Sequence, residues 1–164
     1  MINMSSQFDE ILNLATEWAE IQEKKILQSG IQIDSRLLLS DAKKAGVVHI
    51  NTVRIFAVQT IPDPDHPLLM EACNQMGFLP SRMLGLTLGY GIYIKSTHQE
   101  DHSLRLHELV HVAQYERFGS MKNFLRQYLF EIVKHGYNAA PLEIEAYEFV
   151  KSLYGWKRQA AYNF

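Results

Sequence analysis

The chain has 164 residues, of which 47% are apolar, and its 16 basic and 18 acidic residues give a net charge of -2. Residues 1–164 are therefore expected to form one domain with a buried core, and the near-neutral charge gives no reason to expect a nucleic-acid or membrane-surface partner. The single cysteine, Cys73, excludes an internal disulfide and a zinc cluster of several thiolates. We see no signal peptide and no apolar run long enough to span a bilayer, so we expect a cytoplasmic protein.

The first half of the chain is predicted to contain helices and one strand. Apolar residues recur at helical spacing in three segments that end at or near a glycine, residues 5–30, 35–46 and 67–77. Residues 53–61, VRIFAVQTI, are rich in β-branched and apolar side chains and predict a buried strand. Three prolines predict a loop over residues 62–67.

The stretch 85–96, GLTLGYGIYIKS, alternates as a strand or a hairpin does. One face would pack on the core and carry Leu86, Leu88, Tyr90, Ile92 and Ile94. The other would face outward and carry Thr87, Gly89, Gly91, Tyr93 and Lys95. The two outward glycines indicate a bulge or a close approach of another backbone or, equally well, a tight turn at residues 89–91.

The rest of the chain is predicted to be helical, over residues 103–118, 121–136 and 141–156. Gly119 and Gly136 can end the first two helices, and Pro141 fits the first turn of the third. Residues 157–164 are expected to be loose. Helices and strands followed by helices alone indicate an α+β domain with a small sheet.

The stretch 107–114, HELVHVAQ, carries two histidines four residues apart. On a helix, His107 and His111 project from one face, in the H-E-x-x-H arrangement that binds one zinc ion. Glu108 lies around the helix and can reach a zinc-bound water, whose pKa zinc lowers toward ~7. Composition predicts roughly 0.02 chance matches to this pattern. The alternative is an exposed pair on an amphipathic helix, but the apolar neighbours indicate a buried turn whose polar groups need partners.

A catalytic zinc has three protein ligands, so a third must come from elsewhere in the chain. Glu143 and Glu145 are carboxylates at an otherwise apolar helix start, although acidic residues are also favoured there by the helix dipole. Together with the two histidines, one of these glutamates is favoured as the ligand. Weaker candidates, with simple explanations as helix-end or loop residues, are His135, Asp63, Asp65 and His66.

These motifs resemble the gluzincin branch of the zinc metallopeptidases, which have an H-E-x-x-H helix and a glutamate ligand on a following helix. More closely, residues 42–147 are similar to a little-characterised group of bacterial metallopeptidases. The pieces that carry this likeness are GLTLGYGIYI, HELVHVAQYERFG, FLRQYL and GYNAAPLEIEAY. The N-terminal helix, residues 1–30, lies outside the region of resemblance.

The resemblance implies a zincin-like α+β fold, in which a small mixed sheet places its edge strand above the active-site helix and further helices follow. It implies one zinc ion per chain, held by His107, His111 and Glu143, with Glu108 as the general base. In related gluzincins, a residue four positions after the ligand glutamate orients a zinc histidine, and Tyr147 takes that place here.

Helix geometry separates the two glutamates. Glu143 and Glu145 point about 200° apart, so only one of them can face the metal. Ala146 and Tyr147 lie on the side of Glu143, and a small residue there lets the two helices approach closely. We therefore expect Glu143 to be the ligand, with Glu145 as the alternative that otherwise points to solvent or to a basic residue.

The resemblance also implies that the strand within residues 85–96 lines the substrate cleft, where Gly89, Gly91 and Tyr93 would suit a peptide added as an extra strand. The side chain that stabilises the oxyanion is expected among Tyr137, His135 and Tyr93. The predicted function is zinc-dependent hydrolysis of a peptide or protein substrate. The alternative is a zinc-binding regulatory or peptide-binding protein with this architecture and little or no catalysis.

Overall fold

The structure is a computed structural model that describes residues 4–157. The described helices are α1 (Met4–Ser29), α2 (Arg36–Lys44), α3 (Pro67–Gln75), α4 (His102–Phe118), α5 (Met121–His135) and α6 (Pro141–Tyr154). The strands are β1 (Ile31–Gln32), β2 (Arg54–Val58), β3 (Gly85–Leu88) and β4 (Gly91–Lys95). Short 3-10 turns lie at Ile50–Thr52, Pro80–Arg82, Ser96–His98 and Tyr137–Ala139. Residues 157–164 were expected to be loose, and of these all but Lys157 lie outside the described residues.

The six predicted helices are confirmed, and local chemistry accounts for their ends. Helices α2, α4 and α5 each begin after a capping residue whose side-chain oxygen accepts a hydrogen bond from a backbone N–H of the first turn. The capping residues are Ser35, Asp101 and Ser120. Helix α4 ends at Gly119, whose φ of 79° is a left-handed conformation that glycine adopts without steric cost. These signals lie within a few residues of each end, so the sequence reveals them.

The strands form one mixed sheet with the order β1-β2-β4-β3. Strands β2 and β4 are parallel, and the pairs β1–β2 and β3–β4 are antiparallel. The predicted α+β class with a small sheet is therefore confirmed. Strand β3 lies at one edge of this sheet and packs against α4.

The stretch 85–96 is a hairpin, so the tight turn is the alternative that holds. Leu88 pairs with Gly91 across the turn, and Gly89 has a φ of 66°. A two-residue turn inverts the alternation, so Leu86 shares a face with its partner Tyr93, and Thr87 shares the other with Ile92. The prediction that one side of the stretch is open was wrong, because all of β3 and most of β4 is buried.

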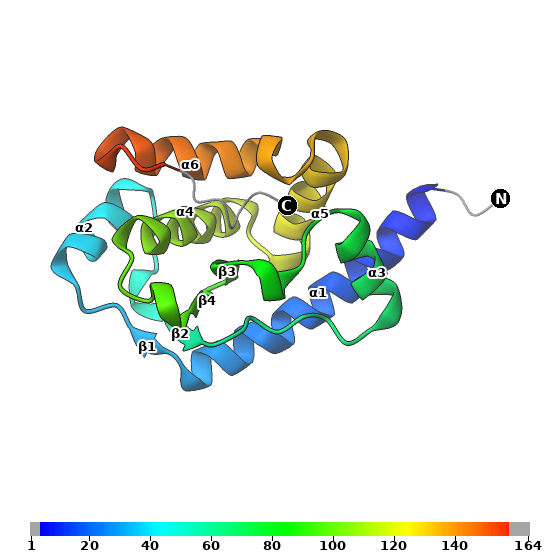
Figure 1. The fold of residues 1–164 in the computed structure, drawn as a ribbon, viewed down its shortest axis with the longest axis horizontal. Coiled ribbons are helices and arrows are strands. Elements are labelled where there is room, and N and C mark those ends of the chain that lie inside the picture. The colour runs from blue at the N-terminus through cyan, green and yellow to red at the C-terminus, as the bar shows by residue number, and fades with distance from the viewer. Residues whose placement is uncertain (1–3, 158–164) are drawn as a thin grey trace.

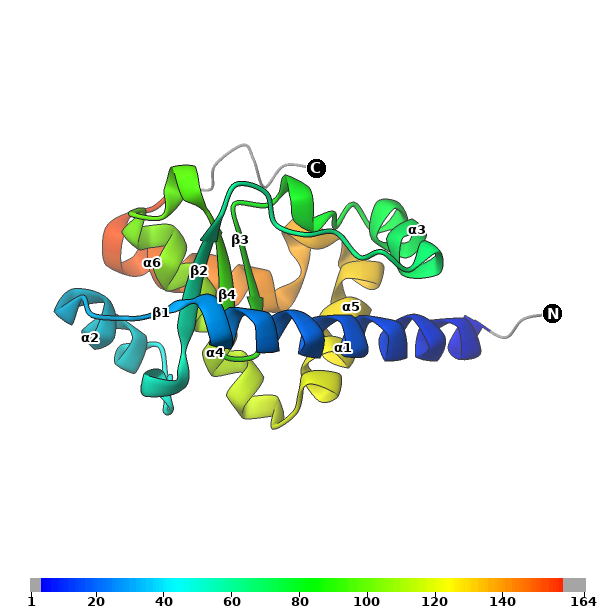
Figure 2. The same ribbon diagram turned by 90° about the horizontal axis from the view of Figure 1, so that it is seen from below.

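Two helices cover this hairpin from opposite sides. Figure 1 shows the layers in order: α6, α4, the sheet and α1. Seen from below in Figure 2, α1 runs across the sheet as a single long helix. Helix α1 packs on β2, β4 and β3 and continues along α5. The helix outside the region of resemblance is thus an integral layer of the fold.

A buried acid ties the far ends of three helices together. Asp41 of α2 accepts hydrogen bonds from Tyr154 at the end of α6 and from Lys44 Nζ at 3.2 Å. The ring Nε2 of His102, at the start of α4, lies 3.0 Å from the same carboxylate. Through Asp41, the end of α6 is thus connected to the start of α4.

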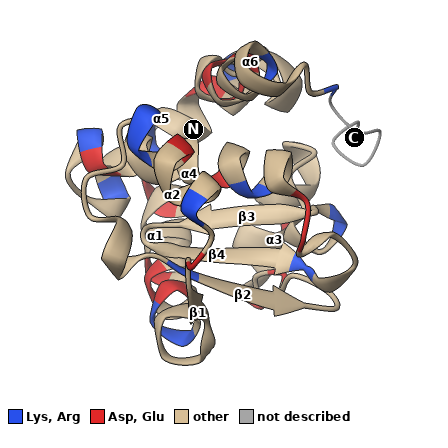
Figure 3. Cartoon of the chain, turned by 90° about the vertical axis from the view of Figure 1, so that its left-hand side faces the viewer, with Lys and Arg blue, Asp and Glu red and all other residues tan. Residues whose placement is uncertain are grey.

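Charged residues of both signs are spread over the helices and loops, while β3 carries none (Figure 3). Within residues 4–157, no helix has the length and apolar character needed to cross a bilayer.

Candidate metal centre

Helix α4 is enclosed on two sides, by β3 and by α6. Apolar residues surround it instead of forming one stripe, which is typical of a buried helix. The polar side chains of HELVH are therefore buried as predicted: His107 is 1%, Glu108 2% and His111 5% exposed. Burying three titratable groups side by side is costly unless each has a partner.

Three polar side chains converge between α4 and α6. Glu143 Oε2 lies 3.2 Å from His107 Nε2, and Glu143 Oε1 lies 3.1 Å from His111 Nε2. The two histidine Nε2 atoms are 3.2 Å apart. Among the described residues, His107, His111 and Glu143 form the group that could hold a metal ion. Glu143, the glutamate expected from its angular position on the helix, is thus the one that lies beside the two histidines.

The spacing and the chemistry of these atoms fit a metal. In a tetrahedral site with ligands about 2.0 Å from zinc, neighbouring ligand atoms lie about 3.3 Å apart. Two imidazole nitrogens and a carboxylate oxygen, all acceptors when unprotonated, meet at nearly that separation. Such a meeting is repulsive without a cation, which a metal ion or a proton on one imidazole supplies.

The electrostatics of the cluster show this need for a cation. Burial favours neutral His111, but the Glu143 carboxylate beside it raises the pKa of His111 to about 9. Burial likewise opposes ionisation of Glu143, but His111 and His107 hold its pKa well below the usual range. Without a metal, the histidine–glutamate cluster therefore carries a proton on the imidazole side.

Gln114 orients His111 and is a residue that the sequence reasoning missed. Its Nε2 donates to the carbonyl of Leu142 at 2.9 Å, so its Oε1 faces His111 Nδ1 at 2.7 Å and accepts a hydrogen bond from the Nδ1–H. With Nδ1 as the donor, the lone pair of neutral His111 is on Nε2, pointing at Glu143. The signal in the sequence was a glutamine on a helix turn that is otherwise apolar.

The first turn of α6 is held from two sides at Leu142. The Leu142 carbonyl accepts from Gln114, and its N–H donates to Glu131 Oε2 of α5 at 2.8 Å. Glu131 is buried and accepts a second bond, from Gln127 at 2.9 Å. Because Leu142 precedes Glu143, these two hydrogen bonds fix the position of Glu143 beside the histidines.

Tyr128 of α5 also reaches the cluster. Its hydroxyl donates to Glu143 Oε1 at 2.6 Å, and its ring meets the ring of His111 edge-on, 6.0 Å between centroids. Burial, and then the Glu143 carboxylate, raise the pKa of Tyr128 well above its usual value, so it stays a donor. The apolar periodicity of residues 121–136 predicts the helix that carries Tyr128 but does not show which neighbour its hydroxyl contacts.

Glu108 faces the edge strand instead of the ligand cluster. The Thr87 hydroxyl lies 2.7 Å from Glu108 Oε2 and 2.9 Å from the Glu108 carbonyl. A Cβ on Gly85 would stand 2.6 Å from Glu108 Oε1, so the strand has room for this carboxylate because residue 85 is glycine. Burial raises the pKa of Glu108, although the nearby His111 charge favours the ionised form.

Glu145 points away from the cluster, as expected from its angular position on the helix relative to Glu143. It accepts two hydrogen bonds from the Arg117 guanidinium, at 2.6 and 2.9 Å, and this partner lowers its pKa. Tyr147 packs against Trp156, and the Trp156 ring lies 5.4 Å from the ring of His107. Trp156 thus contacts both Tyr147 and His107, and the sequence did not suggest this contact.

The remaining predicted residues fall in different places. Gly91 approaches Ile26 of α1, and the Tyr93 hydroxyl donates to Gln22 of α1 at 2.9 Å. Gly89 lies in the turn beside Glu23. The structure thus places Gly89, Gly91 and Tyr93 against α1, away from the cluster, because the hairpin turn inverts the faces.

The other weaker candidates lie outside the ligand cluster as well. His135 is exposed at the end of α5, and Asp65 and His66 are exposed in the proline loop. Asp63 accepts from the Ser81 N–H at 2.8 Å. Tyr137 is buried and packs on Phe78, in a pocket that also contacts the site.

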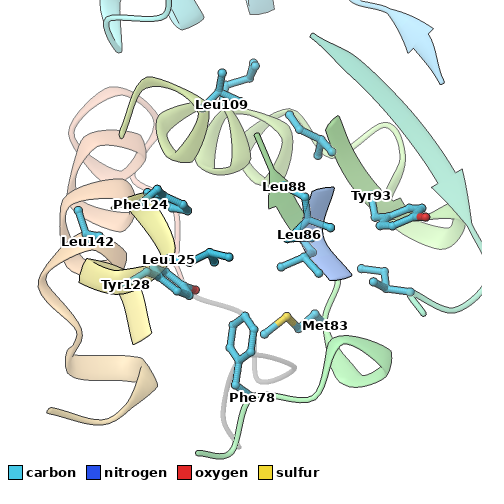
Figure 4. Close-up of a cluster of buried hydrophobic side chains, with 14 of the residues drawn as sticks. Phe78, Met83, Leu86, Leu88, Tyr93, Leu109, Phe124, Leu125, Tyr128 and Leu142 are labelled. Carbon is cyan, nitrogen blue, oxygen red and sulfur yellow. The ribbon is translucent and has the colours of Figure 1, made fainter. Parts of the chain in front are cut away.

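That pocket begins at the site and extends toward α1. Its walls include Glu108, His111 and Glu143 at one end and Trp18 of α1 at the other. Figure 4 shows Phe78, Met83, Leu86, Leu125 and Tyr128 around a common space. The histidine–glutamate cluster, the carboxylate of Glu108 and an apolar pocket thus adjoin one another.

Comparison of the chain with family models, with curated proteins and with solved structures finds no match. The resemblance to gluzincins therefore stays a prediction from the residues quoted for it.

Proposed function

We propose that this protein is a zinc-dependent peptide-bond hydrolase with a zincin-like arrangement. The observation that carries the proposal is the buried group of His107, His111 and Glu143 beside a carboxylate, Glu108, that is not part of it. A purely structural site has no need of an additional buried carboxylate held toward the same pocket. The edge strand β3 above α4 supports the zincin-like reading.

The two histidines and Glu143 would hold the ion, and the remaining residues would move protons. When bound, zinc would lower the pKa of a water molecule and polarise the substrate carbonyl. Glu108 would accept the proton of that water on its carboxylate and then donate it to the leaving amine. Its burial and raised pKa suit a group that must both take and return a proton.

Two neighbours would keep these groups in position. Thr87 holds the Glu108 carboxylate against β3, so the base does not swing into the ligand cluster. Tyr128 is the site tyrosine that we favour for the developing oxyanion, in place of the sequence candidates Tyr137, His135 and Tyr93. Its hydroxyl lies at the cluster and is held protonated by its raised pKa, and it would turn from Glu143 to donate its hydrogen bond to the oxyanion.

The test compares metal content and hydrolysis in matched variants. Wild type should bind about one zinc ion per chain, and His111→Ala should lose it. Glu108→Gln should keep the zinc but lose hydrolysis of a peptide library by ~100-fold or more. A folded protein that takes up no zinc when it is supplied would contradict the proposal.

The two glutamates of α6 give a matched control. Glu143→Ala should weaken zinc binding strongly, while Glu145→Ala, which removes an ion pair with exposed Arg117, should leave it nearly unchanged. The reverse result would move the ligand to Glu145. Tight zinc binding by wild type without cleavage of any library peptide would favour the alternative, a zinc-containing regulatory or peptide-binding protein.

A further inference from the structure

Helix α1 forms the far wall of the apolar pocket that begins at the site. Its residues Ala15, Trp18 and Ala19 line this pocket together with side chains of α3, α5 and β3. The region of resemblance does not include α1, and the mechanism above does not use it. The position of α1 nevertheless places three of its side chains in the same space as Glu108 and His111.

The pocket is small. Its cavity volume is about 50 Å³. By this measure one water molecule needs about 10–15 Å³, so the space holds about four atoms of that size. Four is the number of carbon atoms in a leucine side chain. An indole ring or an arginine side chain is larger than this space.

The walls are apolar away from the metal cluster. Phe78, Met83 and Leu86 face the space, and the Cys73 thiol beside them stays neutral because burial raises its pKa to about 11. A charged group entering there would lose its hydration and gain no charged partner from these walls. A branched aliphatic group would lose unfavourable contact with water instead.

We infer that helix α1 selects the substrate: its side chains limit the pocket beside the scissile bond to one leucine-sized aliphatic residue. This inference rests on the proposed function, because the pocket is a subsite only if the cluster cuts peptides. Burying such a side chain favours a leucine peptide over an alanine peptide by roughly 10- to 100-fold.

The experiment uses the zinc-loaded full chain and short peptides in which each position in turn holds Leu, Ala, Phe or Asp. Wild type should prefer Leu at one residue flanking the cut. Ala19→Leu, which fills the pocket from a position remote from zinc, should lower the ratio of Leu-peptide to Ala-peptide cleavage to about one. Ile21→Ala changes an exposed residue of the same helix and is the matched control.

Trp18→Ala provides the second variant, because it enlarges the pocket without overpacking it. It should shift the preference from Leu toward Phe by roughly 10-fold, and this result decides the question even if Ala19→Leu does not fold. Equal cleavage of Leu and Asp peptides by wild type would overturn the inference. A change of the same factor for all peptides in both variants would overturn it as well.

Binding separates this inference from the proposed function. The Leu peptide should bind Glu108→Gln, measured by fluorescence anisotropy, and Ala19→Leu in that background should weaken binding by about 10-fold. If wild type cuts nothing but this binding pattern is found, the hydrolase proposal fails and the pocket assignment stands. If peptides are cut but their binding affinity does not depend on the side chain, the pocket assignment fails and the hydrolase proposal stands.

Discussion

The role of Gln114 can be tested by removing both of its hydrogen bonds in one variant and only the bond to the Leu142 carbonyl in another. Gln114→Leu has nearly the same size and can neither accept from His111 Nδ1 nor donate to the Leu142 carbonyl. Gln114→Glu keeps an acceptor for His111 but places a carboxylate where the amide donor faced the Leu142 carbonyl. The two variants therefore distinguish the orientation of the histidine from the positioning of α6.

The magnitude follows from two buried bonds of 2.7 and 2.9 Å. Leaving two buried polar groups without their partner costs about 1–3 kcal/mol each, so Gln114→Leu should lower the free energy of unfolding by about 2–6 kcal/mol. Loss of a group that orients a ligand histidine typically weakens metal binding by about 10- to 100-fold. Gln114→Glu should therefore destabilise the fold but keep more of the zinc affinity than Gln114→Leu.

The assay is chelator competition for the zinc dissociation constant, with urea unfolding on the same samples. Glu131→Leu is the control, because it removes the other hydrogen bond at Leu142 and does not touch His111. If both variants are equally destabilised, Gln114→Leu should bind zinc more weakly than Glu131→Leu. Equal zinc affinity of wild type and Gln114→Leu would refute the orienting role.

Three further predictions concern other parts of the molecule. Gly85→Ala should keep zinc but lose most hydrolysis, measured side by side, because its Cβ would stand 2.6 Å from Glu108 Oε1; full activity would show that this carboxylate moves freely. Burial opposes ionisation of Asp41, but hydrogen bonds led by that of Tyr154 lower its pKa below 3.8, so its stabilisation is present above about pH 4 and is lost as pH falls through the lowered value. Urea unfolding at pH 7 and pH 3 should therefore show a smaller acid loss for Asp41→Asn than for wild type. Because burial raises its pKa from 9.0 to about 11, Cys73 should have about 100-fold less thiolate than an ordinary cysteine and react correspondingly slowly with iodoacetamide until urea unfolds the chain.

The sequence predicted the helices well because their signals are local. Apolar periodicity, capping oxygens and terminal glycines all act within a few residues. The faces of the hairpin were mispredicted for an equally local reason. A turn at Gly89 and Tyr90 shifts the alternation by one residue, so Ile92 and Tyr93 exchange sides relative to an unbroken strand.

The grouping of His107, His111 and Glu143 could be predicted, whereas the residues that hold these side chains in place could not. The two histidines and Glu143 have fixed angular relations on their own helices, so spacing suffices for them. Gln114 and Glu131 meet at Leu142 through the packing of three helices, and no spacing along the chain encodes that meeting. A buried polar residue on an apolar helix indicates only that some partner exists.

This difference has a physical consequence for how the site forms. Helix α4 carries both histidines and Glu108, but Glu108 is held by Thr87 of β3 and the Glu143 carboxylate by Tyr128 of α5. An isolated α4 would therefore carry the H-E-x-x-H spacing without the third ligand or the positioned base. The complete site exists only when the sheet, α5 and α6 are all docked on α4, so the proposed metal binding would be linked to the folded state of the whole domain. Zinc should accordingly shift unfolding of the chain as one cooperative transition, and a zinc effect confined to local protection of α4 in hydrogen exchange would contradict this coupling.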